Sequence, residues 1–174
     1  MIRRRTSAVA CALVALGVLG VLAACGSDEP QQPADVSTAD AYNAAIRWYL
    51  STVPAPTDTA NSKPTIVYVA PASGNVIDVQ TQADVAAEMA DMKDVVIVRF
   101  ADLRDDALDL DVEGEPVKED GVLLLVGEVA EGPPPVDFNV GVYHNAEQET
   151  LYSMRIIRSG ETFAAATVTE VAQG

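Results

Sequence analysis

The last third of the chain most constrains the fold, because it contains four strand-like runs separated by short connections. The runs are VLLLVGEVA, VDFNVGVYH, ETLYSMRIIR and ETFAAATVTEV, and EGPPP, NAEQ and SG join them. In the second run, Val136, Phe138, Val140 and Val142 fall on one face of a strand, and polar or small residues alternate with them. Runs of this kind with connections this short predict an antiparallel meander.

Two helices are predicted in the first half of the chain. STADAYNAAIRWYLSTV has apolar residues at helical spacing, and Ser37 and Asp40 approximate a capping box at its start. TQADVAAEMADMK has the same periodicity, with Thr81 and Asp84 as the predicted capping pattern. The apolar side chains that should be buried in this second helix are Val85, Met89 and Met92.

The remaining elements complete an α+β fold. TIVYVA (65–70) and VVIVRF (95–100) are predicted as strands from their β-branched and aromatic content. The acidic segment that follows them predicts an edge strand at Ala107–Val112, with Leu110 and Val112 facing inward. We therefore expect one curved antiparallel sheet of about five to seven strands with a C-terminal meander. The two helices should pack on one face of this sheet.

The N-terminus has the layout of an export signal. Arg3, Arg4 and Arg5 precede an uncharged apolar run at 8–24, and the run ends in Leu22-Ala23-Ala24-Cys25. These four residues resemble the lipobox of bacterial lipoproteins. In that family the resemblance implies transfer of diacylglycerol to the thiol of Cys25, cleavage just before it, and usually acylation of the new amino end. A retained signal anchor is the alternative, because an apolar run only slightly shorter than a span of about 20 residues can still cross a bilayer.

The lipobox predicts three segments in the chain. Residues 1–24 would be the signal peptide, 25–36 a lipidated cysteine with a flexible tether, and 37–174 a single domain. Acyl chains contribute about 0.8 kcal/mol per buried CH₂, so two chains hold a protein on a membrane. Cys11 would leave with the leader and lipid would occupy Cys25, so the mature chain would have no free thiol for a disulfide, a thiolate nucleophile or cysteine-bound zinc.

The charge of the chain excludes one class of partner. The formal net charge is −15, and loss of the three leader arginines would make it more negative. Such a surface repels nucleic acid and anionic lipid headgroups. Membrane attachment must therefore come from lipid rather than from charge.

The body of the chain is similar to a set of secreted and lipid-anchored actinobacterial proteins with no assigned function. The resemblance lies in AYNAAIRWYL, KPTIVYVAP, ADVAAEMADMKDVVIVRFAD, VKEDGVLLLVGEV and YSMRIIRSGETFAA. It implies a leading helix, a VYV strand, a helix running into a buried strand, a DGVLL strand and a final hairpin. Members often have a cysteine pair and a tryptophan near that hairpin. This chain has neither, and Phe163 stands where the aromatic would be.

One acidic segment is a weak candidate for a calcium site. In DLDVEGEPVKED, Asp109, Asp111, Glu113 and Asp120 occupy ligand positions of a calcium-binding loop. Pro116 removes a backbone N–H that such loops use, Asp120 is short for a bidentate ligand, and no helix is predicted after it. The same letters fit an edge strand followed by a turn, so both interpretations stay open.

The catalytic candidates are also weak. Two carboxylates in DLRDDALDLD are compatible with glycoside hydrolysis, which needs a pair at a defined separation. His144 is the only histidine and has no GxSxG partner, and nothing matches a phosphate loop or a dinucleotide fingerprint, so no cofactor is expected.

We therefore expect a lipoprotein on the extracytoplasmic face of the cell membrane, anchored through Cys25. Its domain would be a non-catalytic binding or accessory module of the envelope, with a protein, a glycan or a small molecule as its ligand. The alternatives are an envelope hydrolase that uses paired carboxylates, and a weak calcium-binding module.

Overall fold

The computed structural model describes residues 34–52, 65–73, 76–93 and 95–171, all within one unit at Pro33–Gly174. Cys25 lies outside the described residues, so the structure does not bear on the lipidation prediction. In chain order the elements are α1 (Thr38–Thr52), β1 (Thr65–Pro71), α2 (Val79–Glu88), the 3-10 helix η1 (Ala90–Met92), β2 (Val96–Phe100), the 3-10 helices η2 (Arg104–Ala107) and η3 (Lys118–Asp120), β3 (Val122–Val126), β4 (Val136–Asn145), β5 (Gln148–Ser159) and β6 (Thr162–Glu170).

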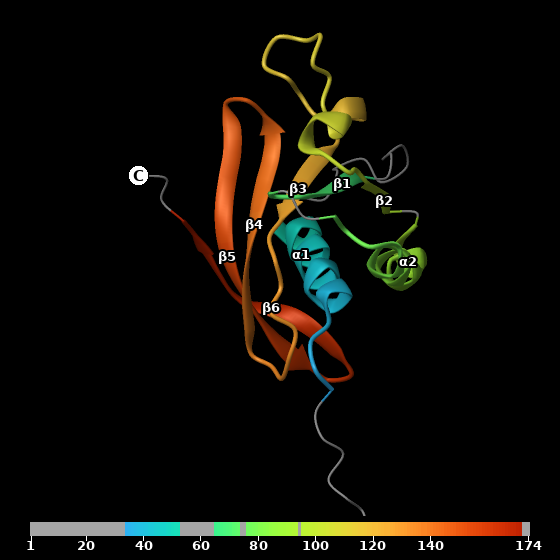
Figure 1. The fold of residues 1–174 in the computed structure, drawn as a ribbon, viewed down its shortest axis with the longest axis vertical. Helices are drawn as coiled ribbons and strands as arrows, with labels where there is room; N and C mark the ends of the chain where they lie inside the picture. Colours follow the sequence, from blue (N-terminus) through green and yellow to red (C-terminus); the bar gives the residue numbers. More distant parts are fainter. Residues whose placement is uncertain (1–33, 53–64, 74–75, 94, 172–174) are drawn as a thin grey trace, which may run out of the picture. The chain divides into compact units, whose positions relative to one another are not determined.

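The six strands form one sheet in the order β2-β1-β3-β4-β5-β6 (Figure 1). Strands β3 to β6 pair antiparallel in sequence order, which confirms the C-terminal meander. Strand β1 pairs in parallel with both β2 and β3. The α+β class with a mostly antiparallel sheet is therefore confirmed, but the expectation of a wholly antiparallel sheet is wrong at β1. For the β1–β2 pair the reason is helix α2, because a strand–helix–strand crossover brings the chain back in the same direction. For the β1–β3 pair, segment 101–121 makes the crossover.

Helix α1 begins where the capping box predicts. The backbone N–H of Ser37 donates to Oδ2 of Asp40 at 2.9 Å, and the N–H of Asp40 donates to Oγ of Ser37 at 3.2 Å. The helix packs chiefly against β6 and α2. The members of its apolar stripe that are buried are Tyr42, Ala45, Ile46 and Tyr49.

Helix α2 begins earlier than predicted. Its N-cap is Asp78, whose Oδ1 accepts from the backbone N–H of Thr81 at 3.0 Å, so Thr81 is a residue of the first turn and not the cap. Asp84 does not cap the helix and instead accepts a hydrogen bond from Gln80 at 2.7 Å. The predicted stripe is confirmed at Val85 and Met89, which are buried, and Met92 is half-buried in η1.

The sheet is covered on both faces over its parallel part. Helices α1 and α2 and the inward side chains of all six strands form the main core. On the opposite face, the segment 101–121 buries Leu108 and Val117 against β1, β3 and β4. This segment has one isolated bridge, between these two residues, so the predicted edge strand is wrong. The bridge closes a loop that turns away from the sheet, and Leu110 and Val112 are therefore 55% and 50% exposed.

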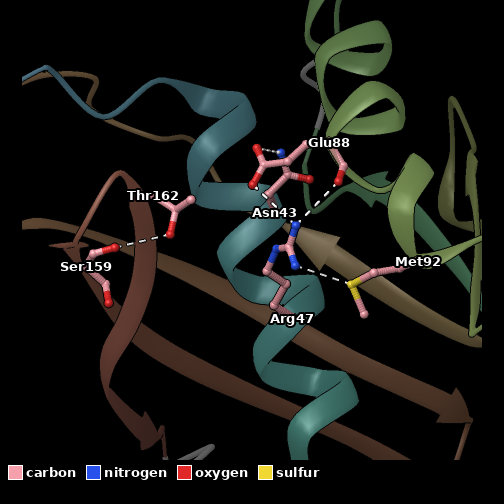
Figure 2. A network of polar contacts seen from close by, with 6 residues as sticks. All are labelled: Asn43, Arg47, Glu88, Met92, Ser159 and Thr162. Carbon is pink, nitrogen blue, oxygen red and sulfur yellow. Dashed lines mark hydrogen bonds and ion pairs between the residues drawn. The ribbon is translucent and has the colours of Figure 1, made fainter.

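A polar network holds α1 against α2 (Figure 2). Asn43 is buried and donates through Nδ2 to Oε2 of Glu88 at 2.6 Å. Arg47, one turn along α1, lies 3.6 Å from Oε1 of the same carboxylate and donates to Sδ of Met92 at 3.3 Å. Because a buried N–H donor needs an acceptor, the contact from Nδ2 of Asn43 to Glu88 favours one arrangement of the two helices.

Replacing Glu88 by alanine should lower the free energy of unfolding by about 1–3 kcal/mol, because Nδ2 of Asn43 would be buried without its acceptor. Urea unfolding of the fragment 26–174, which contains the whole described core, measures the change. The exposed Glu170, at the end of β6, supplies the control variant Glu170→Ala. Equal effects of the two substitutions would contradict the network.

Candidate functional site

A crevice opens where the parallel strands β1 and β3 reach their carboxyl ends. It has a volume of about 300 Å³, and the starts of α1 and α2 border it. We call it the β1–β3 crevice. In sheets with parallel strands, ligands bind preferentially outside the carboxyl ends of the strands, so the topology favours this edge as a binding site. Its polar side chains are Thr38, Tyr42, Asp78, Thr81 and Glu128, and its apolar side chains are Pro71, Val76, Ile77, Val126 and Val129.

A second depression of about 480 Å³ adjoins this crevice at the ends of β1 and β2, and the two share Pro71 and Val76. Its border includes Leu103, which is 66% exposed, and Val76, which is 78% exposed. The β1–β3 crevice instead has buried side chains in its lining, including Ile77 and Val126. It is therefore the better-formed of the two sites.

Carboxylates of the protein occupy the helix ends at the crevice. Glu131 accepts from both the backbone N–H and Oγ1 of Thr38, each at 2.8 Å, at the start of α1. Asp78 accepts from the backbone N–H of Thr81 at 3.0 Å and from its Oγ1 at 2.6 Å, at the start of α2. Helix N-termini commonly bind phosphate or carboxylate ligands through these N–H groups. Here the chain's own carboxylates take that position, so the crevice is a poor anion site.

These hydrogen bonds keep the two carboxylates ionised at neutral pH. The side-chain and backbone hydrogen bonds from Thr81 lower the pKa of Asp78, and those from Thr38 lower the pKa of Glu131. Tyr42, at the same crevice, has its pKa raised, first by burial and then by the charge of Asp78. The crevice therefore combines fixed negative charge with a neutral phenol.

The pKa of Glu131 gives a test of this arrangement. Since hydrogen bonding lowers its pKa in the folded chain, the ionised carboxylate stabilises the fold above the ordinary value of 4.5, and this contribution is lost as the pH falls through the folded value. Wild-type protein should be more stable than Glu131→Gln at neutral pH, and the difference should shrink in acid. Urea unfolding of both proteins across pH measures this difference. The charge repulsion that both proteins share cancels when their free energies of unfolding are subtracted. A difference that does not change with pH would contradict the assignment.

The structure does not gather the candidate calcium ligands into a cluster. Asp109, Asp111 and Glu113 lie on the loop between the bridged residues, and Asp120 lies in η3. Among the described residues, no group of three or more His, Cys, Asp or Glu side chains is placed to hold a metal ion. Calcium binding stays a prediction without a ligand set in this part of the chain.

The structure does not bring the described candidate catalytic acids together in a pocket. The carboxylates of 102–120 are exposed, except for half-buried Asp109. Glu119 forms an ion pair with Arg99 that lowers the pKa of the carboxyl, whereas a general acid needs a raised pKa. His144 is exposed on β4, with its ring 6.1 Å from that of Tyr49. The geometry gives neither the hydrolase nor a histidine-based mechanism any support in this part of the chain.

Comparison with protein-family models, with curated proteins and with solved structures found no match to this chain. Within the described ranges, no helix is both long enough and apolar enough to cross a membrane. The candidate site therefore rests on its own geometry. The polar residues that form it were not among the functional candidates from the sequence, because they come from three separate segments that only the folded sheet brings together.

Proposed function

We propose that this protein is a lipid-anchored binding module on the extracytoplasmic face of a bacterial cell membrane. The observation that carries the anchoring is the sequence Leu22-Ala23-Ala24-Cys25 at the end of a charged and then apolar leader. Lipid on Cys25 holds the domain at the membrane, and the residues before Val36 serve as a tether. Val36 itself belongs to the domain, because it is buried in the core and bridged to Gly132. The actinobacterial resemblance of the body supports the same location.

The binding part of the proposal concerns the β1–β3 crevice. Its volume of about 300 Å³ is at the lower end of the range for small-molecule sites, so among the ligands considered we favour a small molecule over a protein or a glycan chain. The negative charge of the chain argues against nucleic acid.

Binding rather than catalysis is favoured by the state of the acidic groups. Every described carboxylate with a shifted pKa has that pKa lowered, and each accepts a hydrogen bond or forms an ion pair: Asp78, Glu119, Glu131 and Asp137. Such groups act as fixed charges and acceptors at neutral pH. A hydrolase would need at least one carboxyl with a raised pKa as its proton donor.

A fragment screen by ¹⁵N NMR on residues 26–174 tests the binding function. We expect small molecules to shift the backbone amides of Thr38, Thr81 and Gly127, which border the crevice. Gly127→Ala is the matched variant, because an added Cβ would lie 2.9 Å from the backbone oxygen of Asn139 and force this wall to move. A library in which no compound shifts these amides, or in which the variant binds as well as wild type, would contradict a ligand site here.

A further inference from the structure

We propose that the β1–β3 crevice binds a small organic cation: an ammonium group carried on a short apolar chain. This inference rests on the proposed function and names the ligand class of the same site. The lining offers hydrogen-bond acceptors and negative charge at one side and aliphatic side chains at the other. A ligand that matches it must donate hydrogen bonds, carry positive charge and have an apolar portion.

Each hydroxyl group of the lining already donates a hydrogen bond to an acceptor within the protein. Oγ1 of Thr38 donates to Glu131 at 2.8 Å, Oγ1 of Thr81 donates to Asp78 at 2.6 Å, and the hydroxyl of Tyr42 donates to the backbone oxygen of Gly127 at 3.5 Å. A hydroxyl has one proton and two acceptor lone pairs. All three oxygens can therefore accept a hydrogen bond from a ligand, but cannot donate one without breaking an existing contact.

The other polar side chains of the lining add only acceptors. The carboxylates of Asp78 and Glu128 offer only acceptor oxygens, and among the described residues no lysine, arginine or histidine borders the crevice. An anionic ligand would meet two carboxylates and no donor from the described side chains. An ammonium group would find several oxygens, at least one of them ionised, and charge-assisted hydrogen bonds of this kind are the strong ones.

Tyr42 contributes a further, buried acceptor to the crevice. Its side chain is only 6% exposed, and it borders the crevice. Its single hydrogen bond within the described chain is the long contact to Gly127, and no described residue donates to its oxygen. A hydroxyl oxygen that donates one hydrogen bond keeps its acceptor lone pairs. A ligand N–H in the crevice can therefore donate to this oxygen without breaking its contact to Gly127.

The apolar side of the crevice selects an organic cation over a metal ion. Ile77, Val126 and Val129 are buried and present aliphatic surface, which cannot replace the oxygen shell of a hydrated metal. The same surface can cover a few methylene groups, each worth about 0.8 kcal/mol when buried.

Three probes of matched shape test the proposal: n-butylammonium chloride, 1-butanol and sodium butyrate. Each is titrated into the ¹⁵N-labelled fragment 26–174 at constant ionic strength, with sodium and potassium chloride as further titrations. We expect saturable shifts of the Thr38, Thr81 and Gly127 amides with butylammonium. Butanol should bind about tenfold more weakly or worse, because the charge-assisted contacts are lost, and butyrate should not bind.

Two substitutions test the negative charge of the crevice without disturbing the fold. Asp78→Asn removes the charge, but asparagine caps a helix as well as aspartate does, so α2 should be retained. Glu128→Gln changes an exposed side chain and leaves the core untouched. Asp78→Asn should weaken butylammonium binding by about tenfold, in line with the loss of one charge-assisted contact, and Glu128→Gln should weaken it less. The control is Asp84→Asn, an exposed carboxylate of α2 outside the lining, which should bind as wild type does.

Several outcomes would overturn the inference. These are equal binding of butanol or butyrate, no saturable shift with butylammonium, the same shifts with the inorganic salts, or equal effects of Asp78→Asn and Asp84→Asn. Failure here is distinguishable from failure of the binding function itself. If library compounds of another charge class occupy the crevice, the site stands and only its ligand class is wrong.

Discussion

Replacement of Cys25 by serine should remove all fatty-acid label from the protein and leave its leader uncleaved. A hydroxyl cannot take the place of the thiol in the lipid transfer that the lipobox implies, and cleavage before residue 25 follows that transfer. Metabolic labelling with an alkyne fatty acid, with the protein followed on a gel, measures both effects in one experiment. The label should fall to background, and the protein should migrate as the longer precursor.

Cys11 provides the matched control for this experiment, since it lies within the predicted leader. Cys11→Ser should keep full label and normal processing. Label that persists on the Cys25→Ser protein, or that disappears from the Cys11→Ser protein, would contradict the anchoring. Labelling distinguishes these cases better than membrane fractionation, because an uncleaved apolar leader can itself hold a precursor at the membrane.

Leu124→Ala should destabilise the domain by about 2–5 kcal/mol, the range for deleting a buried leucine side chain. Leu124 is 1% exposed on β3, with β1 and β4 on either side of it in the sheet. Removal of its side chain leaves a cavity beneath the helices. Urea unfolding of the fragment 26–174 measures the loss.

Leu110→Ala is the control for this change, because it deletes the same atoms from a side chain that is 55% exposed on the loop. Its expected effect is less than about 0.5 kcal/mol, as for surface substitutions in general. Equal losses would mean that the loop packs as an inward-facing edge strand, contrary to the structure. The two substitutions together test the packing of the core and the exposure of the 107–112 segment.

The strand-like runs of the last third and their short connections were sufficient to predict β3 to β6. In β4, the side chains at 136, 138 and 140 are buried while Asp137 and Asn139 are exposed, so a period of two residues reports the buried face directly. Short connections then leave antiparallel pairing as the simple arrangement. Local pattern and tertiary structure agree over this part of the chain.

The parallel pairing of β1 could not be predicted in the same way. Its pairing with β3 depends on segment 101–121 crossing the sheet, and that segment has no helical periodicity to mark it as a crossover. Alternating Leu110 and Val112 fitted an edge strand, but the loop closed by the Leu108–Val117 bridge leaves both side chains in solvent. Alternation predicts a buried face only when a partner strand or a core is present to receive it.

The start of α2 was mispredicted for a local reason. Thr81 and Asp84 matched a capping pattern, but Asp78 stands three residues before Thr81 and is an equally good cap. Choosing between them requires the position of Ile77, which is buried at the crevice and fixes where the chain enters the helix.

The candidate site depended most on the fold. From the sequence, Tyr42 was predicted only as part of the apolar stripe of α1. Its hydroxyl became a candidate ligand-binding group when the structure placed it at the crevice beside the adjacent ends of β1 and β3. The available signal was a single carboxylate at the start of each helix, Asp40 in the first turn of α1 and Asp78 at the N-cap of α2. Acids at such positions are common caps, so they indicate a binding site only when a cavity lies beside them.

We propose that a domain with this crevice is held at a membrane by lipid on Cys25. Intact-mass spectrometry of the protein purified from its native membrane tests it most directly. We expect a polypeptide that begins at Cys25 and carries the additional mass of a diacylglyceryl group, with or without a further acyl chain. A polypeptide that retains Met1 and carries no acyl mass would contradict it.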